Sequence, residues 1–293
     1  MGTESKKPRS VWERLEHMDP RISYWLLIFV IVVPFLRPLG LPISISKETQ
    51  SFYNTLDALR PGSVVLFDIS SGPAAYGEIG PGSIAMMEYV TVVYPGRHEG
   101  GRLRIAIVSG GEAEGAIMYE AYARPRLEKA GFQYGADYAW FGFIAGGETM
   151  VARLADSIPS LLRNDFFGTT IDKLPVMKGV SNYKDVSVVI VWDSVDATAW
   201  YVRHWGAKGV RVGTVCVAVE IPAYITFYRS GEVFGIIGSS RGGAELELLV
   251  GKPGVGVATT DTLSTSHLLV IILIIVVHIG LLARKYLPST GKR

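Results

Sequence analysis

Cysteine is almost absent from this chain of 293 residues, since Cys216 is the only one. One thiol cannot form an intrachain disulfide, and it cannot supply a cysteine-based zinc or iron–sulfur site. The five histidines never show H-x-x-x-H spacing, so we expect no histidine-rich metal site and no metal or other cofactor. Cys216 lies in the apolar run 215–219, which predicts a small buried hydrophobic residue at this position.

A strong charge of one sign is also missing. The 29 Lys and Arg residues nearly balance the 27 Asp and Glu residues, and the net charge is +2. No basic stripe with interleaved aromatic residues occurs, so we expect no nucleic-acid partner. Nucleotide motifs are missing as well. The stretches 109–111 and 238–243 do not make G-x-G-x-x-G at the first βα turn, and no G-x-x-x-x-G-K-[ST] occurs, which disfavours dinucleotide binding and a P-loop NTPase.

Long apolar runs are present, by contrast, and 48% of the residues are hydrophobic. The first run spans 22–42, where Arg37 follows the uncharged core and Pro34 is expected to kink or end a helix. The second run spans 263–283, contains no Asp, Glu, Lys or Arg, and stops at Arg284. A bilayer core of about 30 Å needs about 20 helical residues, so each run predicts one transmembrane helix.

A cleaved signal peptide is the alternative for the first run. It would need a compact basic segment before the apolar core and a small-residue cleavage site after it, and the sequence favours an uncleaved anchor. Basic residues concentrate in the leader 1–21 and in the tail 284–293. By the positive-inside rule, both termini are cytoplasmic and the central domain is extracytoplasmic. We therefore expect an integral protein of the cell membrane, with two spans and the lipid bilayer as a partner.

Residues 46–254 alternate short apolar runs of strand length with helical patterns. The expected strands are 63–69, 103–108, 137–143, 186–192, 210–215 and 233–237. The expected helices are 46–60, 83–94, 112–130, 148–162, 196–205, 221–229 and 241–250, and 254–262 has the composition of a short linker. This alternation predicts an α/β domain with a mainly parallel, doubly wound, Rossmann-like sheet. A TIM barrel is the weaker alternative because it needs two more β/α units.

Open parallel sheets bind ligands beyond the carboxyl ends of their strands. The loops expected there carry hydroxyls, carboxylates, glycines and an arginine, which together can hold a small polar or anionic ligand. The candidate ligand-binding residues are Asp68, Ser70, Ser71, Ser109, Glu112, Glu148, Asp193, Ser194, Glu220 and Arg241. Plain turn chemistry stays equally open, because tight βα turns and helix N-caps need Gly and Ser in any such sheet.

Two further features leave alternatives open. Asp68, Asp193 and Asp196 would form a carboxylate cluster for a cation if the first and fourth strands are neighbours, whereas an acid such as Asp196 can simply cap a helix. The connection 164–180 is long and carries aromatic residues, proline, glycine and charge together. Such a segment is typical of a lid or a contact surface, but it can also be a packed structural excursion.

Four segments resemble an uncharacterised prokaryotic membrane-protein family whose members have two spans around an α/β domain. These segments are 134–138, 143–148, 167–180 and 241–254. The resemblance covers nearly the whole chain and implies the same architecture, but it implies no catalytic residue. The region 210–238 also faintly resembles periplasmic binding-protein-like domains, and this likeness implies no ligand.

Three functions fit the sequence. The double anchor, with no evident metal or nucleophile–base motif, favours a non-catalytic ligand-sensing or assembly subunit of a membrane complex, which associates with itself or with another membrane protein. The alternative is an enzyme on a small polar or lipid-linked substrate, with Asp68, Glu112, Glu148 and Asp193 as acid–base groups. The third is an oligomeric scaffold that associates through its spans, where Gly280 allows close approach.

Overall fold

The structure, a computed structural model, describes residues 19–286, which form two units. One unit is the α/β domain Pro42–Val257, and the other is a helical hairpin formed by the chain before Pro42 and after Val257. Most of the predicted leader 1–21 and tail 284–293 lies outside the described residues. The predictions for these two segments therefore stay predictions.

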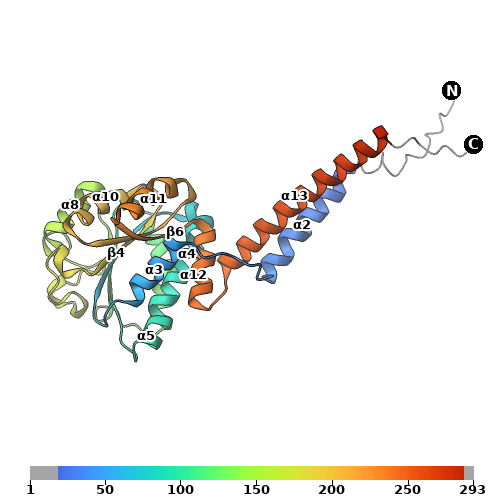
Figure 1. Cartoon of the computed structure of the whole chain (residues 1–293). Helices are drawn as coiled ribbons and strands as arrows, with labels where there is room; N and C mark the ends of the chain where they lie inside the picture. The colour runs from blue at the N-terminus through green and yellow to red at the C-terminus, as the bar shows by residue number, and fades with distance from the viewer. Residues whose placement is uncertain (1–18, 287–293) are drawn as a thin grey trace, which may run out of the picture. The chain divides into compact units, whose positions relative to one another are not determined.

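Six parallel strands form the centre of the domain, in the order β3-β2-β1-β4-β5-β6 (Figure 1). The strands are β1 (Val64–Ser70), β2 (Arg104–Ser109), β3 (Tyr138–Phe143), β4 (Val188–Asp193), β5 (Arg211–Cys216) and β6 (Val233–Gly238). β1 and β4 are buried along their whole length, as strands covered on both faces should be. The doubly wound Rossmann-like sheet is confirmed, and the TIM-barrel alternative is wrong because the sheet is open.

Helices cover both faces of the sheet. Those of the domain are α3 (Lys47–Asp57), α4 (Tyr76–Glu88), α5 (Tyr94–Arg97), α6 (Gly115–Met118), α7 (Arg124–Lys129), α8 (Glu148–Asp156), α9 (Ile158–Leu161), α10 (Ala197–His204), α11 (Ile221–Ser230) and α12 (Ser239–Val250). The core on one face is built with α3, α4, α6, α7 and α12, and the core on the other with α8 to α11. Short 3₁₀ turns lie at 73–75, 171–173, 175–177, 183–185, 206–208 and 218–220.

Two predicted helices contain a π-helical turn that the sequence expectations missed. These turns are η2 (Tyr89–Val93) and η3 (Tyr119–Ala123). Each starts at a tyrosine six residues before a proline, Pro95 or Pro125. The residue just before the proline donates its backbone N–H to the carbonyl of that tyrosine, five residues earlier. Because proline has no N–H to donate, the wider turn accommodates it without ending the helix.

Another predicted helix, 148–162, is broken into α8 and α9. Ser157 separates them with an extended backbone at φ −154° and ψ 104°. Pro159 lies in the first turn of α9, where a proline is tolerated because its missing N–H would have no partner there.

Buried carboxylates of α12 hold the places where the chain enters and leaves the domain. Glu245 accepts hydrogen bonds from the backbone N–H (3.0 Å) and the hydroxyl (2.6 Å) of Ser46, the residue that caps α3. Glu247 accepts backbone hydrogen bonds from residues 254, 256 and 257, each at 2.8 Å. Burial raises the pKa of Glu247, against the opposite effect of these three donors.

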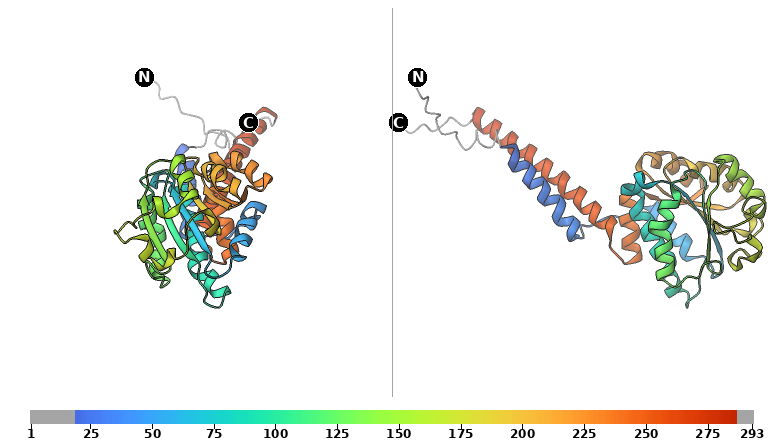
Figure 2. Two further views of the ribbon diagram at one scale, coloured as in Figure 1. Left: turned by 90° about the vertical axis from the view of Figure 1, so that its left-hand side faces the viewer. Right: turned by 180° about the vertical axis from the view of Figure 1, so that it is seen from behind.

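The second unit consists of α2 (Pro20–Leu36) and the part of α13 (Val255–Tyr286) that follows the domain, and the two helices lie side by side (Figures 1 and 2). Among residues 19–286, α13 is the one helix long and apolar enough to cross a membrane, over Val255–Ala283. Only 6% of its most apolar window is buried, which is unlike the core helix of a globular protein. The predicted linker 254–262 is wrong, because α13 already begins at Val255.

α2 is shorter than the predicted first span 22–42. It has 17 residues and ends before Arg37, so it measures about 26 Å at 1.5 Å per residue, against a bilayer core of roughly 30 Å. Pro34 lies inside the helix without ending it. The structure therefore shows one helix of spanning length, and the second span remains a prediction.

Polar contacts join the two helices of the hairpin. The carboxylate of Asp261 accepts hydrogen bonds from the backbone N–H groups of Gly40 (2.9 Å) and Leu41 (3.1 Å), in the segment that follows α2. The hydroxyl of Thr265 donates to the carbonyl of Val30 at 2.8 Å. Each of these contacts satisfies a backbone group that would be costly to leave unpaired outside water.

We predict that Asp261→Leu loosens the hairpin, because it leaves two backbone N–H groups without an acceptor at about 1–3 kcal/mol each. Amide hydrogen exchange at Gly40 and Leu41, measured on the full chain in lipid nanodiscs, should accelerate at least tenfold. Asp261→Asn keeps one acceptor oxygen and should show a smaller increase, and Ser266→Ala should show none. Unchanged protection in the Leu variant would contradict the role of Asp261.

Candidate functional site

The strand order reverses between β1 and β4, which is where an open α/β sheet normally offers a ligand crevice. Ser70 at the end of β1 is in register with Asp193 at the end of β4, so the prediction that these strands adjoin is confirmed. Six of the candidate residues lie on these two strand ends or on the neighbouring end of β2. They are Asp68, Ser70, Ser71, Ser109, Asp193 and Ser194.

The loop after β2 lies directly against the end of β1. The N–H of Gly110 donates to Asp68 Oδ1 at 2.8 Å, and the N–H of Gly111 donates to Ser70 Oγ at 2.8 Å. Ser70 Oγ in turn donates to the same Asp68 oxygen at 2.8 Å, and Ser109 Oγ donates to the carbonyl of Ile69 at 2.9 Å. These serines and the aspartate therefore use their polar groups to join the two strand ends.

The approach of this loop requires glycine. A Cβ atom at Gly110 would lie 2.7 Å from Asp68 Oδ2, and one at Gly111 would lie 2.6 Å from a side-chain carbon of Val195. Both distances are shorter than side-chain contacts allow. The glycines that we expected to line a ligand cleft thus permit close packing between the loops after β2 and β4.

The end of β4 is held in the same way. Asp193 accepts hydrogen bonds from the backbone N–H groups of residues 195, 197 and 198 and from the hydroxyl of Tyr224 at 2.7 Å. It therefore anchors the start of α10, the role that we expected of Asp196. Asp196 instead has a left-handed backbone at φ 66° and makes no side-chain cap. Ser194 Oγ donates to Ser71 Oγ at 3.1 Å, so the two sides of the switch point contact each other.

Burial decides the electrostatics of Asp68. The residue is fully buried, and this raises its pKa to about 6, against the lowering effect of hydrogen bonds from Gly110 and Ser70. Its second oxygen, Oδ2, has the hydroxyl of Tyr201 as a polar neighbour, but the two groups fall outside hydrogen-bond geometry. Asp68 is thus close to neutral below pH 6 and negatively charged above it.

A second group of acids lies beside β4 and β5. Burial, followed by the charges of Asp193, Asp196 and Glu78, raises the pKa of Glu220 to about 8. Burial also raises the pKa of the Cys216 thiol, which the structure confirms as a buried, free cysteine. Within the described residues no group of His, Cys, Asp and Glu side chains has the arrangement of a metal site. The aspartates are therefore not placed as a cation cluster there.

Glu148 and Arg241 lie apart from the switch point, whereas Glu112 lies at its rim, after β2 and near Gly72. Glu148 forms an ion pair with Arg203 (2.7 Å) and a hydrogen bond with His204 (3.0 Å) between α8 and α10. Glu112 is half-buried, and its carboxylate lies close to Gly72. Arg241 lies on α12 and pairs with Glu245 at 3.2 Å. The candidate residues therefore do not line one common cleft.

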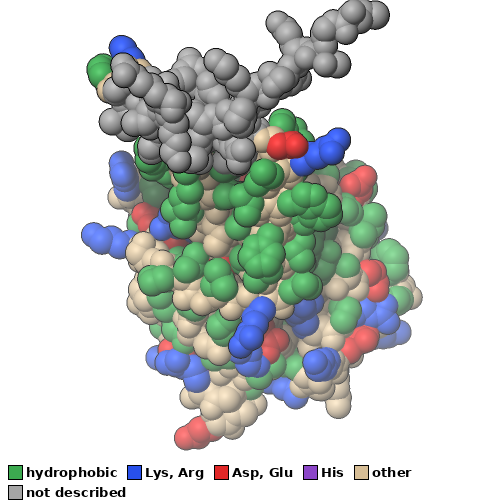
Figure 3. Space-filling model, turned by 90° about the vertical axis from the view of Figure 1, so that its right-hand side faces the viewer, with side chains coloured by type: hydrophobic (Ala, Val, Ile, Leu, Met, Phe, Trp, Pro, Cys, Tyr) green, Lys and Arg blue, Asp and Glu red, His purple; other side chains and the backbone are tan. Residues whose placement is uncertain are grey.

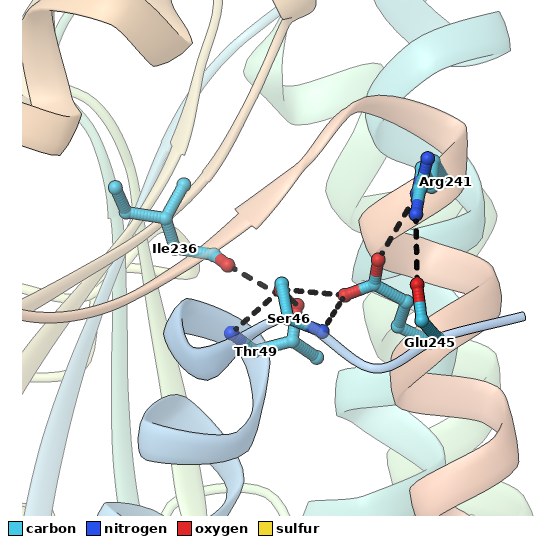
Figure 4. Close-up of polar contacts among 6 residues, drawn as sticks. Ser46, Thr49, Ile236, Arg241 and Glu245 are labelled. Carbon is cyan, nitrogen blue, oxygen red and sulfur yellow. Dashed lines mark hydrogen bonds and ion pairs between the residues drawn. The ribbon is translucent and has the colours of Figure 1, made fainter.

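A cavity of about 240 Å³ surrounds Arg241, and we call it the α12 cavity. Its lining is Ser46, Glu48, Thr49, Ile221, Ile225, Ile236, Gly238, Arg241, Gly242 and Glu245. Figure 4 shows Arg241 and Glu245 of α12 facing Ser46 and Thr49 at the start of α3. Of these residues the sequence expectations named Arg241 alone, because 199 positions separate Ser46 from Glu245 and no local pattern links them.

One further motif was missed. Residues 238–242 fit G-x-S-x-G at a strand-to-helix turn, the pattern of a hydrolase nucleophile elbow. The positive φ of this turn, +56°, is at Ser239 rather than at the central Ser240. Across residues 19–286, no histidine or carboxylate is within hydrogen-bond distance of either hydroxyl. The strained residue is therefore not the central serine of the motif, so the turn lacks both the backbone of an elbow and a base beside it.

The long connection 164–180 presents two exposed aromatic side chains beside β3, Phe166 and Phe167. We call the surface that they form together with the half-buried Tyr134, against which Phe167 packs, the aromatic edge. Phe166 and Phe167 are 59% and 56% exposed, and Phe167 packs edge-on against Tyr134 with ring centroids 5.1 Å apart. The N–H of Phe166 donates to the carbonyl of Trp140 at 2.9 Å, so the segment covers part of the β3 edge.

Asp165 holds this aromatic edge in place. The buried carboxylate accepts hydrogen bonds from the backbone N–H groups of Phe167 (3.0 Å) and Thr169 (2.7 Å) and from the hydroxyl of Tyr134 (2.9 Å). Two exposed phenylalanines are thus fixed on a rigid turn. Of the roles that we left open for the connection, this geometry fits a contact surface better than a lid.

No family model matches the chain, and no curated protein and no solved structure shows significant similarity to it. The likeness to a two-span membrane-protein family, like the faint likeness to binding-protein domains, remains a prediction.

We predict that Asp68→Asn stabilises the domain at neutral pH. The folded chain holds its Asp68 proton up to about pH 6, whereas the ordinary pKa is 3.8. The stabilising contribution of the protonated form is therefore complete below pH 4 and is lost as the pH rises through 6. A shift of this size corresponds to about 3 kcal/mol. Asn keeps the acceptor oxygen and carries no charge, so its advantage should grow from near zero at pH 4 to about 1–3 kcal/mol at pH 7.5.

Thermal and denaturant unfolding of the full chain in detergent at several pH values measures this difference. Glu232→Gln, at an exposed position, should track the unmodified chain at every pH. An Asn variant whose stability differs from that of the unmodified chain by the same amount at pH 4 and pH 7.5 would show that Asp68 does not titrate in this range.

Proposed function

We propose that this protein is a non-catalytic assembly subunit of a membrane complex, whose α/β domain binds another membrane protein through the aromatic edge. The observation that carries the proposal is the pair Phe166 and Phe167, more than half exposed and fixed by Asp165. Exposed aromatic side chains on a rigid support are typical of interaction surfaces, because they lose little conformational entropy on binding.

The switch point supports a non-catalytic role. Its serines and aspartates bond to backbone donors or to one another, and Asp68, Ser70, Ser71 and Asp193 are fully buried. Of the four acid–base candidates for the enzyme alternative, two are thus part of the fold, and Glu148 is engaged in a surface ion pair with Arg203. A substrate would have to displace contacts that hold the strand ends together.

In this proposal, both helices of the hairpin lie in the bilayer. Long apolar side chains of α2 and α13 are exposed, among them Trp25, Phe29, Ile271 and Ile275. Hydrophobic side chains cover much of the face shown in Figure 3. The short α2 reaches across if the following segment to Leu41, which Asp261 holds, completes the crossing. Both termini are then cytoplasmic and the domain is extracytoplasmic.

The double variant Phe166→Ser, Phe167→Ser should abolish the complex and leave the fold intact. In the native host, the tagged full chain should extract with mild detergent as a complex larger than the single chain, and the double variant should migrate as the single chain. Phe143→Ser is the matched control, since Phe143 is a 44% exposed phenylalanine of β3 outside the aromatic edge. Native mass measurement follows the size of the complex, and thermal unfolding follows the integrity of the fold.

Two outcomes would contradict the proposal. The first is a complex that survives the double substitution with unchanged size. The second is a chain that is single in every sample, including the unmodified one. A complex containing only copies of this chain would instead support the scaffold alternative, and the buried Gly280 of α13 would then be the position to substitute.

The expected topology is tested by cysteine labelling. Cys216 is buried, so a membrane-impermeant maleimide should react in intact cells only with an introduced thiol. Ser230→Cys, on the exposed end of α11, should be labelled from outside, and Lys292→Cys in the tail should be labelled only after the membrane is permeabilised. Labelling of Lys292→Cys in intact cells would disprove the expected orientation, with a cytoplasmic tail.

A further inference from the structure

The α12 cavity combines an apolar wall with a cationic group. Ile221 and Ile225 of α11 and Ile236 of β6 supply the wall, and Arg241 is the one basic side chain of the lining. A volume of about 240 Å³ holds roughly eight water-sized groups at ~30 Å³ each. This is room for a charged head group and a short aliphatic stretch.

Arg241 is fixed and still has donors free. Its Nε donates to Glu245 at 3.2 Å and one terminal nitrogen donates to Ser44 Oγ at 3.3 Å, while its side chain is 65% exposed. A guanidinium has five N–H donors, so three remain for a ligand. Glu245 is only 3% exposed and also accepts two hydrogen bonds from Ser46, so it holds the arginine in place through one donor and leaves the free donors to a ligand.

The backbone around the cavity supplies partial positive charge, against the formal charge of −1 that Arg241, Glu48 and Glu245 together give the lining. The first turns of three helices, α3, α11 and α12, contribute lining residues, and each has at least ten residues. α11 and α12 have no side-chain cap at their N-termini. The partial positive charge of a helix N-terminus favours an anion. The carboxylate of Glu48 opposes it and thereby disfavours a doubly charged ligand.

We propose that the α12 cavity binds a small amphiphilic monoanion, with its carboxylate or phosphodiester head at Arg241 and its aliphatic part against the three isoleucines. This inference is independent of the proposed assembly function, which rests on the other edge of the sheet. The same chemistry is offered by a free short-chain acid and by an anionic lipid, and the experiment separates these sources.

Octanoate is the probe, titrated calorimetrically into the full chain in nanodiscs of zwitterionic phosphatidylcholine. We expect saturable binding, and none for octanol, which lacks the charge, or for acetate, which lacks the chain. Arg241→Gln should weaken binding 10- to 100-fold, as expected for loss of charge-assisted hydrogen bonds. Glu48→Gln should strengthen it about three- to tenfold, because it removes the opposing charge.

Arg229→Gln is the matched control, because Arg229 is exposed near the end of α11 and does not line the cavity. Arg241→Lys keeps the charge without the planar fork and should give an intermediate affinity, which guards against a Gln variant that merely unfolds. Loss of octanoate binding in nanodiscs that contain anionic phosphatidylglycerol would identify the lipid as the source, and unchanged binding would identify a soluble acid.

Several results would overturn the proposal. They are no octanoate binding at millimolar concentration, equal binding of octanol, equal affinity in folded Arg241→Gln, or weaker binding in Glu48→Gln. None of these results bears on the complex that is lost on substitution of Phe166 and Phe167, so failure of the two proposals can be told apart.

Discussion

The domain depends on one helix that holds both ends of its chain. Glu245 and Glu247, two positions apart on α12, bind the entering segment at Ser46 and the leaving segment at 254–257. Residues two apart on a helix point in different directions, so one helix can reach both segments. Each carboxylate is 3% exposed and accepts at least three hydrogen bonds, which compensates the cost of burying it.

The sheet has the strand order of a ligand-binding Rossmann-like domain, but the site where such domains bind is filled from within. Gly110 and Gly111 bring the loop after β2 against β1, and Ser71 reaches across to Ser194. The strand order therefore does not decide the function here, because function depends on which groups remain available at the strand ends. In this chain, exposed aromatic side chains lie beside β3, and Arg241, with donors still free, lies beside β6.

The six strands could be predicted because buried parallel strands are continuous apolar runs, and the helices between them because their polar and apolar residues alternate with helical period. The π-helical turns, the helical start of α13 at Val255 and the α12 cavity could not be predicted. A proline within a helical pattern indicates an interruption. Only the structure shows that the interruption is a π-helical turn, in which the carbonyls of Tyr89 and Tyr119 accept backbone N–H groups five residues later. The segment 254–262 looked like a linker because its small polar residues have no strong helical pattern. The carboxylate of Glu247 on α12 accepts the backbone N–H groups of residues 254, 256 and 257, and these hydrogen bonds hold the first turn of α13.

The α12 cavity and the entry of the chain share one carboxylate. Glu245 bonds to Ser46 with one oxygen and to Arg241 with the other. An anion bound at Arg241 competes with Glu245 for the guanidinium, and any loss of that pairing leaves more negative charge on the oxygens that accept from Ser46. The bond from the Ser46 hydroxyl should then strengthen, since hydrogen bonds to a charged acceptor gain with its charge. Occupancy of the cavity and the hydrogen bonds that hold Ser46, the N-cap of α3, are thus linked through a single buried side chain.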